Sequence, residues 1–231
     1  FSNLSQKIID ATVIVASSGD IDRIKAAGES FPVPDIYFNS TGTGFFIGNE
    51  GYIVTAKHVT DNIKKDDIYV LTPDKKKYKA ELVNQNGKSD FALLKLADKN
   101  FPGLALGYFE NIEIGEDIGF IGFSIGTGLT KPLVYRGTVS AKGLSDTGLK
   151  TFSINAFVNK GNSGGPVFSA KTGRVIGMLS ARQRDVSSDQ FINLPSGYSS
   201  ALTLGSIDPV KFNVDLYNKT VKLVGDVSQV G

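Results

Sequence analysis

Short apolar runs of four to seven residues, rich in β-branched and aromatic side chains, recur along the 231-residue chain between Gly, Asn, Asp and Pro. This pattern is typical of strands joined by turns. Twelve runs fall into two groups of six, on either side of a turn-rich stretch at residues 100–107. The predicted strands are 11–16, 44–47, 52–56, 68–71, 79–84 and 91–96, then 117–122, 134–140, 151–155, 166–169, 175–180 and 199–202. We therefore expect an all-β protein with two six-stranded units.

The boundaries of these units follow from the strand positions. We predict an N-terminal segment over 1–35, a first barrel over 36–105 that also takes the strand 11–16, and a second barrel over 106–205. The tail, 206–231, has apolar residues at every second position from Val210 to Leu216, which predicts a hairpin. Helix is expected only as short pieces within 4–9 and 20–27 and after His58.

Composition excludes several classes of site. The chain has no Cys and one His, so it has no disulfide framework, thiolate nucleophile or zinc site built on two imidazoles. We expect no metal and no cofactor. The net charge of +2 predicts no nucleic-acid partner. No apolar run approaches the roughly 18 residues that a membrane span requires.

The segment 161–165, GNSGG, is the sharpest local signal. A Ser hydroxyl becomes a nucleophile when a base takes its proton and backbone N–H groups stabilise the oxyanion. Flanking glycines suit that chemistry because they let the backbone bend and leave the hydroxyl of Ser163 accessible. The alternative is a Gly-rich turn without chemistry.

Two further residues complete a catalytic set. His58 ends the apolar run YIVTAKH, where an active-site loop would start. Asp90 begins the apolar run DFALLKL, so its neighbours would bury it, and a buried carboxylate can orient an imidazole. Taken singly, His58 could be a surface or core residue and Asp90 a cap at the start of a strand.

The order His58, Asp90, Ser163 distinguishes between architectures. Subtilisin-type enzymes have the order Asp, His, Ser, and α/β-hydrolases have Ser, Asp, His. The order found here is that of chymotrypsin-type enzymes, which consist of two six-stranded antiparallel β-barrels with the active site in the cleft between them. The strand count, obtained separately, agrees with that fold.

The chain resembles trypsin-like serine proteases of the HtrA/Deg branch. The resemblance rests on STGTGFFI at 40–47, GYIVTAKHV at 51–59, SDFALLKL at 89–96, residues 115–122, and the stretch from Asn155 to Gly165. It implies Ser163 as nucleophile, His58 as general acid–base, Asp90 as the orienting carboxylate, and the N–H groups of Gly161 and Ser163 as the oxyanion hole.

The sequence also departs from this family. About 25 residues follow Gly205, too few for the PDZ domain that HtrA proteins usually carry, so we expect none in this chain. Lys57 precedes His58 where the family commonly has a small or amide side chain. Asn162 replaces the Asp that pairs with a new N-terminal amine in many trypsin-like enzymes, so we expect no activation by such an ion pair.

The resemblance places a substrate pocket around Phe157, Ser180, Ala181, Arg182 and Phe191. Trypsin-like enzymes that cleave after Lys or Arg carry an Asp six residues before the nucleophile, and this chain has Phe157 there. We expect an apolar pocket, narrowed by Phe157 or Phe191, that favours small or medium aliphatic residues.

The leading hypothesis is a serine endopeptidase that acts on proteins or peptides through an acyl-enzyme. One alternative is a protease-fold binding protein with a latent or blocked active site, and another is an esterase. We expect a monomer or homotrimer in an extracytoplasmic location, although a chain without Cys fits any redox compartment.

Overall fold

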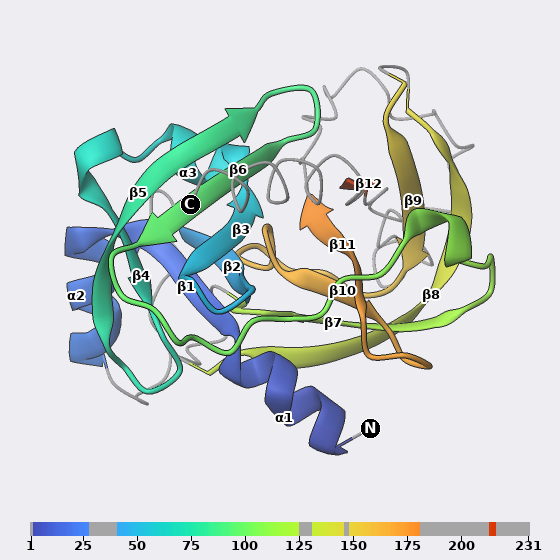
Figure 1. Ribbon diagram of the computed structural model, residues 1–231, viewed down its shortest axis with the longest axis horizontal. Helices are drawn as coiled ribbons and strands as arrows, with labels where there is room; N and C mark the ends of the chain where they lie inside the picture. The colour runs from blue at the N-terminus through green and yellow to red at the C-terminus, as the bar shows by residue number, and fades with distance from the viewer. Residues whose placement is uncertain (1, 28–40, 125–130, 146–147, 181–212, 216–231) are drawn as a thin grey trace, which may run out of the picture.

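Two antiparallel β-barrels lie side by side in the computed structural model, which describes residues 2–27, 41–124, 131–145, 148–180 and 213–215 (Figure 1). Each barrel has six strands within these ranges. The predicted fold class, two six-stranded antiparallel barrels of the chymotrypsin type, is confirmed.

The first barrel is formed by β1 (Thr12–Ser17), β2 (Thr41–Ile47), β3 (Tyr52–Ala56), β4 (Ile68–Leu71), β5 (Lys77–Asn86) and β6 (Phe91–Leu96). Their spatial order is β1-β2-β3-β6-β5-β4, and β4 pairs with β1 to close the barrel. Ala56 at the end of β3 pairs with Phe91 at the start of β6. This register brings the segment after β3 next to the segment before β6.

The second barrel contains β7 (Asp117–Gly122), β8 (Leu133–Leu144), β9 (Lys150–Asn155), β10 (Pro166–Ser169), β11 (Val175–Ser180) and β12 (Asn213–Asp215). The short β12 lies between β9 and β11 and closes the sheet. It falls in the range predicted as a tail. The predicted strand 199–202 and the rest of the predicted hairpin lie outside the described residues.

Four strands are longer than their apolar runs predict, β9 by a single residue. β2 begins at Thr41, and β5 and β8 extend beyond their predicted ranges at both ends. Register shifts interrupt the ladders between Leu82 and Asn84 in β5 and between Val139 and Ala141 in β8. A bulge breaks the alternation of polar and apolar residues, which explains why these strands look shorter in the sequence.

Helices cover the ends of the barrels: α1 (Ser2–Asp10), α2 (Ser18–Ala27) and α3 (Lys57–Asp61), with 3-10 turns η2 (Lys65–Asp67) and η3 (Phe109–Asn111). α1 and α2 are longer than expected. None of the helices in the described ranges combines the length and apolar character that crossing a membrane would require.

The two barrels share apolar packing. One core cluster fills the first barrel and includes Ile121, Phe168, Val175 and Met178 of the second. A separate cluster around Phe120, Phe152 and Leu179 fills the second barrel. The shared cluster therefore packs the two barrels against each other.

Candidate active site

The β3–β6 pairing places His58 against Asp90. His58 lies in α3, directly after β3, and Asp90 lies directly before β6. The backbone N–H of His58 donates to Oδ1 of Asp90 at 3.0 Å, and His58 Nδ1 lies 2.6 Å from Oδ2. Since an ionised carboxylate only accepts hydrogen bonds, Nδ1 carries the proton, which leaves Nε2 free to act as a base.

Asp90 is held firmly at the junction of the barrels. It is only 3% exposed, and its φ of 49° lies in the left-handed region. Its backbone carbonyl accepts from Lys57 N–H at 2.8 Å, and the Ser180 hydroxyl donates to Oδ2 at 2.5 Å. A side chain of the second barrel thus helps to fix the carboxylate of the first.

The same contacts set the charge of Asp90. Burial, the largest single influence, raises the pKa of its carboxyl, but the opposing influences prevail and leave that pKa below its usual value. These are the hydrogen bonds from His58 and Ser180 and the attraction of a charged His58 ring. Asp90 therefore stays ionised when His58 takes up a proton.

The loop that carries Ser163 lies between the barrels. Ser163 is 8% exposed, and its backbone carbonyl accepts from Thr43 N–H of β2 at 2.8 Å. Gly164 has a φ of 86°, and a Cβ there would lie 2.0 Å from the Thr43 carbonyl oxygen and 3.0 Å from Ala56 N. Only glycine allows the Ser163 loop to approach β2 and β3 so closely.

Two N–H groups of this loop have no hydrogen-bond partner among the residues that the structure describes. Asn162, Gly164 and Gly165 each donate to a backbone carbonyl, at 3.2, 2.7 and 3.0 Å. In contrast, the N–H groups of Gly161 and Ser163 form no hydrogen bond with another residue of the described ranges. These are the two donors that the resemblance to trypsin-like proteases implies for the oxyanion hole.

The structure joins His58 to Asp90 directly and places the Ser163 loop against the strands that lead to His58. Within the part of the chain that the structure describes, the Ser163 hydroxyl forms no hydrogen bond, neither with His58 Nε2 nor with any other group. The side chain of His58 is 36% exposed, so its ring is open to an incoming substrate.

The predicted pocket residues divide into three groups. Phe157 is 57% exposed, more than a side chain at the floor of a closed pocket would be, so its position does not support a narrowing role. Ser180 is buried and directs its hydroxyl to Asp90, a contact that sequence reasoning missed. Ala181, Arg182 and Phe191 lie outside the described residues.

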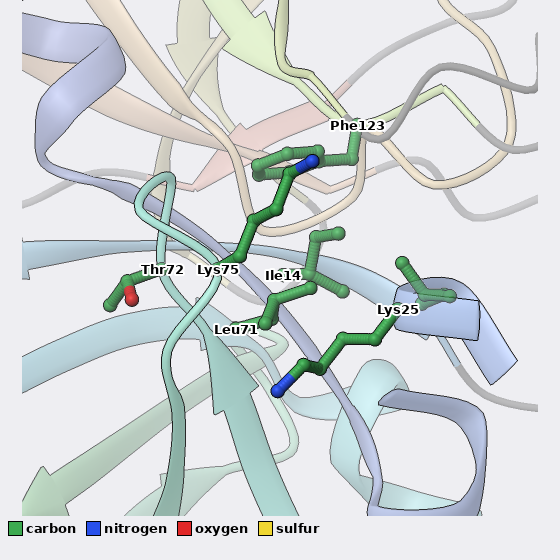
Figure 2. A pocket seen from close by; sticks show the side chains of 7 residues that line it. Ile14, Lys25, Leu71, Thr72, Lys75 and Phe123 are labelled. Atoms are coloured by element: carbon green, nitrogen blue, oxygen red, sulfur yellow. The ribbon is translucent and has the colours of Figure 1, made fainter. Parts of the chain in front are cut away.

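A small pocket elsewhere lies apart from this site (Figure 2). It is formed by Ile14, Ile24, Leu71 and Phe123, with Lys25, Thr72 and Lys75 also lining it. At about 20 Å³ it has room for one water molecule. None of the predicted site residues lines it.

Comparisons with known proteins agree with this arrangement. The model of the family described as "Trypsin-like peptidase domain" matches residues 42–178, a range that contains His58, Asp90 and Ser163. A "Probable periplasmic serine endoprotease DegP-like" of Pseudomonas putida is 38% identical over 144 residues, which make up 61% of this chain and 29% of that protein. The protein of the same description from Hahella chejuensis is 37% identical over equal shares.

A solved structure described as "HtrA-type protease AlgW with tripeptide" has a TM-score of 0.68 and 24% sequence identity, and the match covers 97% of this chain and 62% of that one. It shows a shared fold. The chain spans less than a third of the length of the curated relatives it matches. Since this family model matches more than half of the chain, the chain belongs to the trypsin-like peptidases.

Proposed function

We propose that this chain is a serine endopeptidase that hydrolyses peptide bonds with Ser163, His58 and Asp90. The observation that carries the proposal is the hydrogen bond between His58 Nδ1 and the buried Asp90 carboxylate, made where the Ser163 loop meets the first barrel. A neutral imidazole oriented by a buried carboxylate is the base that a serine nucleophile needs.

In the first step, Ser163 Oγ attacks the carbonyl carbon of the peptide bond, and its proton passes to His58 Nε2. The N–H groups of Gly161 and Ser163 would donate to the negative oxygen of the tetrahedral intermediate. Their lack of partners among the described residues supports this role, because neither would have to break a bond first. The intermediate then expels the amine, which takes the proton from His58 and leaves an acyl-enzyme.

In the second step, water attacks the acyl group while His58 accepts one of its protons. His58 returns that proton to Ser163 Oγ as the acid departs. Asp90 remains ionised throughout and stabilises the imidazolium, in keeping with the lowered pKa of its carboxyl. The bond between Ser163 Oγ and His58 would form as substrate binds, since such contacts are often long before binding.

We propose small or medium aliphatic residues at the cleavage position. Phe157 stands where trypsin-like enzymes that cleave after Lys or Arg carry an acid, and the chain has no second His to bind an acidic side chain. Discrimination would be modest, because one methylene in an apolar pocket changes binding by only about 1–3 kcal/mol. The remaining pocket residues, Ala181, Arg182 and Phe191, stay predictions.

We further propose protein or peptide substrates and an extracytoplasmic location, supported by relatives that are described as probable periplasmic serine endoproteases. The oligomeric state, a monomer or a homotrimer, stays a prediction.

The testing experiment uses a fluorophosphonate probe and casein, with Ser163→Ala as the paired variant. We expect the wild type to be labelled and to cleave casein, and Ser163→Ala to do neither. Labelling without casein cleavage would favour an esterase. Absence of both would favour a binding protein with a blocked site and would overturn the proposal.

A further inference from the structure

Thr43 of β2 is the side chain that connects the Ser163 loop to the first barrel. It is fully buried. Its hydroxyl donates to the Gly161 carbonyl oxygen at 2.7 Å and accepts from Phe123 N–H, just beyond β7, at 3.0 Å. Its own N–H donates to the Ser163 carbonyl oxygen. One residue thus contacts the backbone of both oxyanion-hole residues.

The donor on the far side of Thr43 is itself fixed. Phe123 is 4% exposed, and it packs in one cluster with Ile14 and Leu71 of the first barrel and Ile24 of α2. Figure 2 shows this ring at the edge of the small pocket, above Ile14. Because apolar packing anchors Phe123, its N–H offers the Thr43 hydroxyl a stationary partner.

The Thr43 backbone is fixed as well. Its carbonyl oxygen accepts from the Thr55 hydroxyl of β3 at 2.7 Å, and its neighbour Gly44 pairs with Thr55 across the ladder. Thr55 is fully buried too. The Thr43 hydroxyl therefore starts from a rigid strand rather than from a loop.

The backbone orientation of Gly161 depends on the hydrogen bond from the Thr43 hydroxyl. It has no side chain, and its φ of 93° is open mainly to glycine. Among the described residues, the bond from the Thr43 hydroxyl is the one hydrogen bond that Gly161 makes. Without it, the peptide unit that carries the Gly161 carbonyl would keep one bond, the 3.2 Å hydrogen bond from Asn162 N–H to the Asn159 carbonyl oxygen.

We infer that Thr43 is a positioning residue for the oxyanion hole: its hydroxyl holds the Gly161 carbonyl and thereby aims the N–H groups of the Ser163 loop at the substrate oxygen. The inference rests on the proposed serine endopeptidase function. Thr43 touches neither substrate nor the reacting atoms and acts through Gly161.

The variant that tests this role is Thr43→Val, which keeps the branched shape and removes the hydroxyl. It leaves the Gly161 carbonyl and the Phe123 N–H without their partner. The main-chain bond from residue 43 to the Ser163 carbonyl stays, so the loop remains attached while Gly161 is released. The loss should therefore fall on the transition state rather than on substrate binding.

The measurements are kcat and KM on labelled casein and the rate of labelling by a fluorophosphonate as a function of pH. We expect kcat of Thr43→Val to fall by about ten- to a hundredfold, somewhat less than the effect of deleting an oxyanion donor outright. KM should stay within about twofold, as expected for a contact that acts in the transition state. The acid limb of the labelling rate should keep its midpoint, because the His58–Asp90 pair is untouched.

Two further variants separate positioning from mere packing. Thr43→Ser keeps the hydroxyl and should restore most of kcat. Thr12→Val is the matched control, because Thr12 is equally buried in the first barrel and its hydroxyl donates to the Ile8 carbonyl, away from the site. It should lower the melting temperature and leave kcat unchanged.

Wild-type kcat in Thr43→Val, or an equal loss in Thr43→Ser, would overturn the inference. If Thr43→Val does not fold, Thr43→Ser and Thr43→Ala make the same comparison, since both lose the methyl group and only Ser keeps the hydroxyl. A wild type that neither reacts with the probe nor cleaves casein would instead defeat the proposed function.

Discussion

The Ser180 hydroxyl donates a 2.5 Å hydrogen bond to Oδ2 of Asp90, a residue 90 positions earlier in the chain and in the other barrel. Oδ2 also faces His58 Nδ1. One carboxylate oxygen therefore receives a donor from each barrel, and the orientation of the His58 ring depends on how the barrels meet.

Replacing Ser180 by Ala should weaken catalysis without abolishing it. The pKa of Asp90 would rise toward its usual value, and the carboxylate would hold His58 less firmly. We expect kcat/KM to fall by about three- to tenfold, in line with the loss of one hydrogen bond to a charged group. Ser169→Ala is the matched control, because Ser169 is also buried in the second barrel and donates to a different carboxylate, Glu116. Equal activity in the two variants would contradict this role for Ser180.

The lowered pKa of Asp90 predicts how stability depends on pH. A carboxyl whose pKa is lower in the folded state contributes its full stabilisation above the unfolded value of about 3.9 and loses it as the pH falls through the folded value. Asp90→Asn should therefore destabilise the protein at pH 7, and the difference from wild type should shrink in strong acid. Urea unfolding of both proteins between pH 7 and 3 measures this. A difference that grows on acidification would refute it.

Losses at the three proposed catalytic residues should not add. Ser163→Ala removes the attacking atom, so a second change at His58 has little left to remove. We expect the double variant of Ser163 and His58 to retain about the activity of Ser163→Ala alone. Casein hydrolysis by purified single and double variants tests this. A double variant whose loss equals the product of the two single losses would show that they act independently.

Gly164→Ala should destabilise the protein strongly. The new Cβ would meet a positive φ and a carbonyl oxygen 2.0 Å away, so we expect a loss of more than about 2 kcal/mol in the free energy of unfolding. Gly115→Ala separates the two causes, because Gly115 has a φ of 88° and no heavy atom within 4 Å of a Cβ. It should lose about 1 kcal/mol. Denaturant titration of both variants gives the comparison, and equal losses would mean that the close approach to β2 has no cost.

Sequence reasoning found the features that local pattern determines. Runs such as 52–56 and 91–96 are buried except for the half-buried Tyr52 and Lys95, so their apolar character marks them directly. β5 and β8 were predicted as shorter strands because bulges and exposed polar ends hide the full extent of their alternation. α1 and α2 were expected as shorter pieces because their apolar stripes are interrupted by polar residues.

The supporting residues of the site could be identified only from the three-dimensional structure. Ser180 follows an apolar run like many strand ends, and nothing near it in sequence indicates Asp90 as its partner. Thr43 gave one usable signal, since the glycines on either side mark a closely approached strand, and a Cβ at Gly42 would lie 3.0 Å from the Ser163 carbonyl oxygen. That signal indicates an approach but does not say which segment makes it.

The division of the site between barrels also sets the order in which it is assembled during synthesis. The strands of the first barrel end at Leu96, well before Ser163, so a growing chain can complete the strands that place His58 and Asp90 before Ser163 has been translated. Domains generally fold in this N-to-C order on the ribosome. On the function proposed above, a nascent chain that has folded only its first barrel lacks the proposed nucleophile and cannot cleave its neighbours until the second barrel docks.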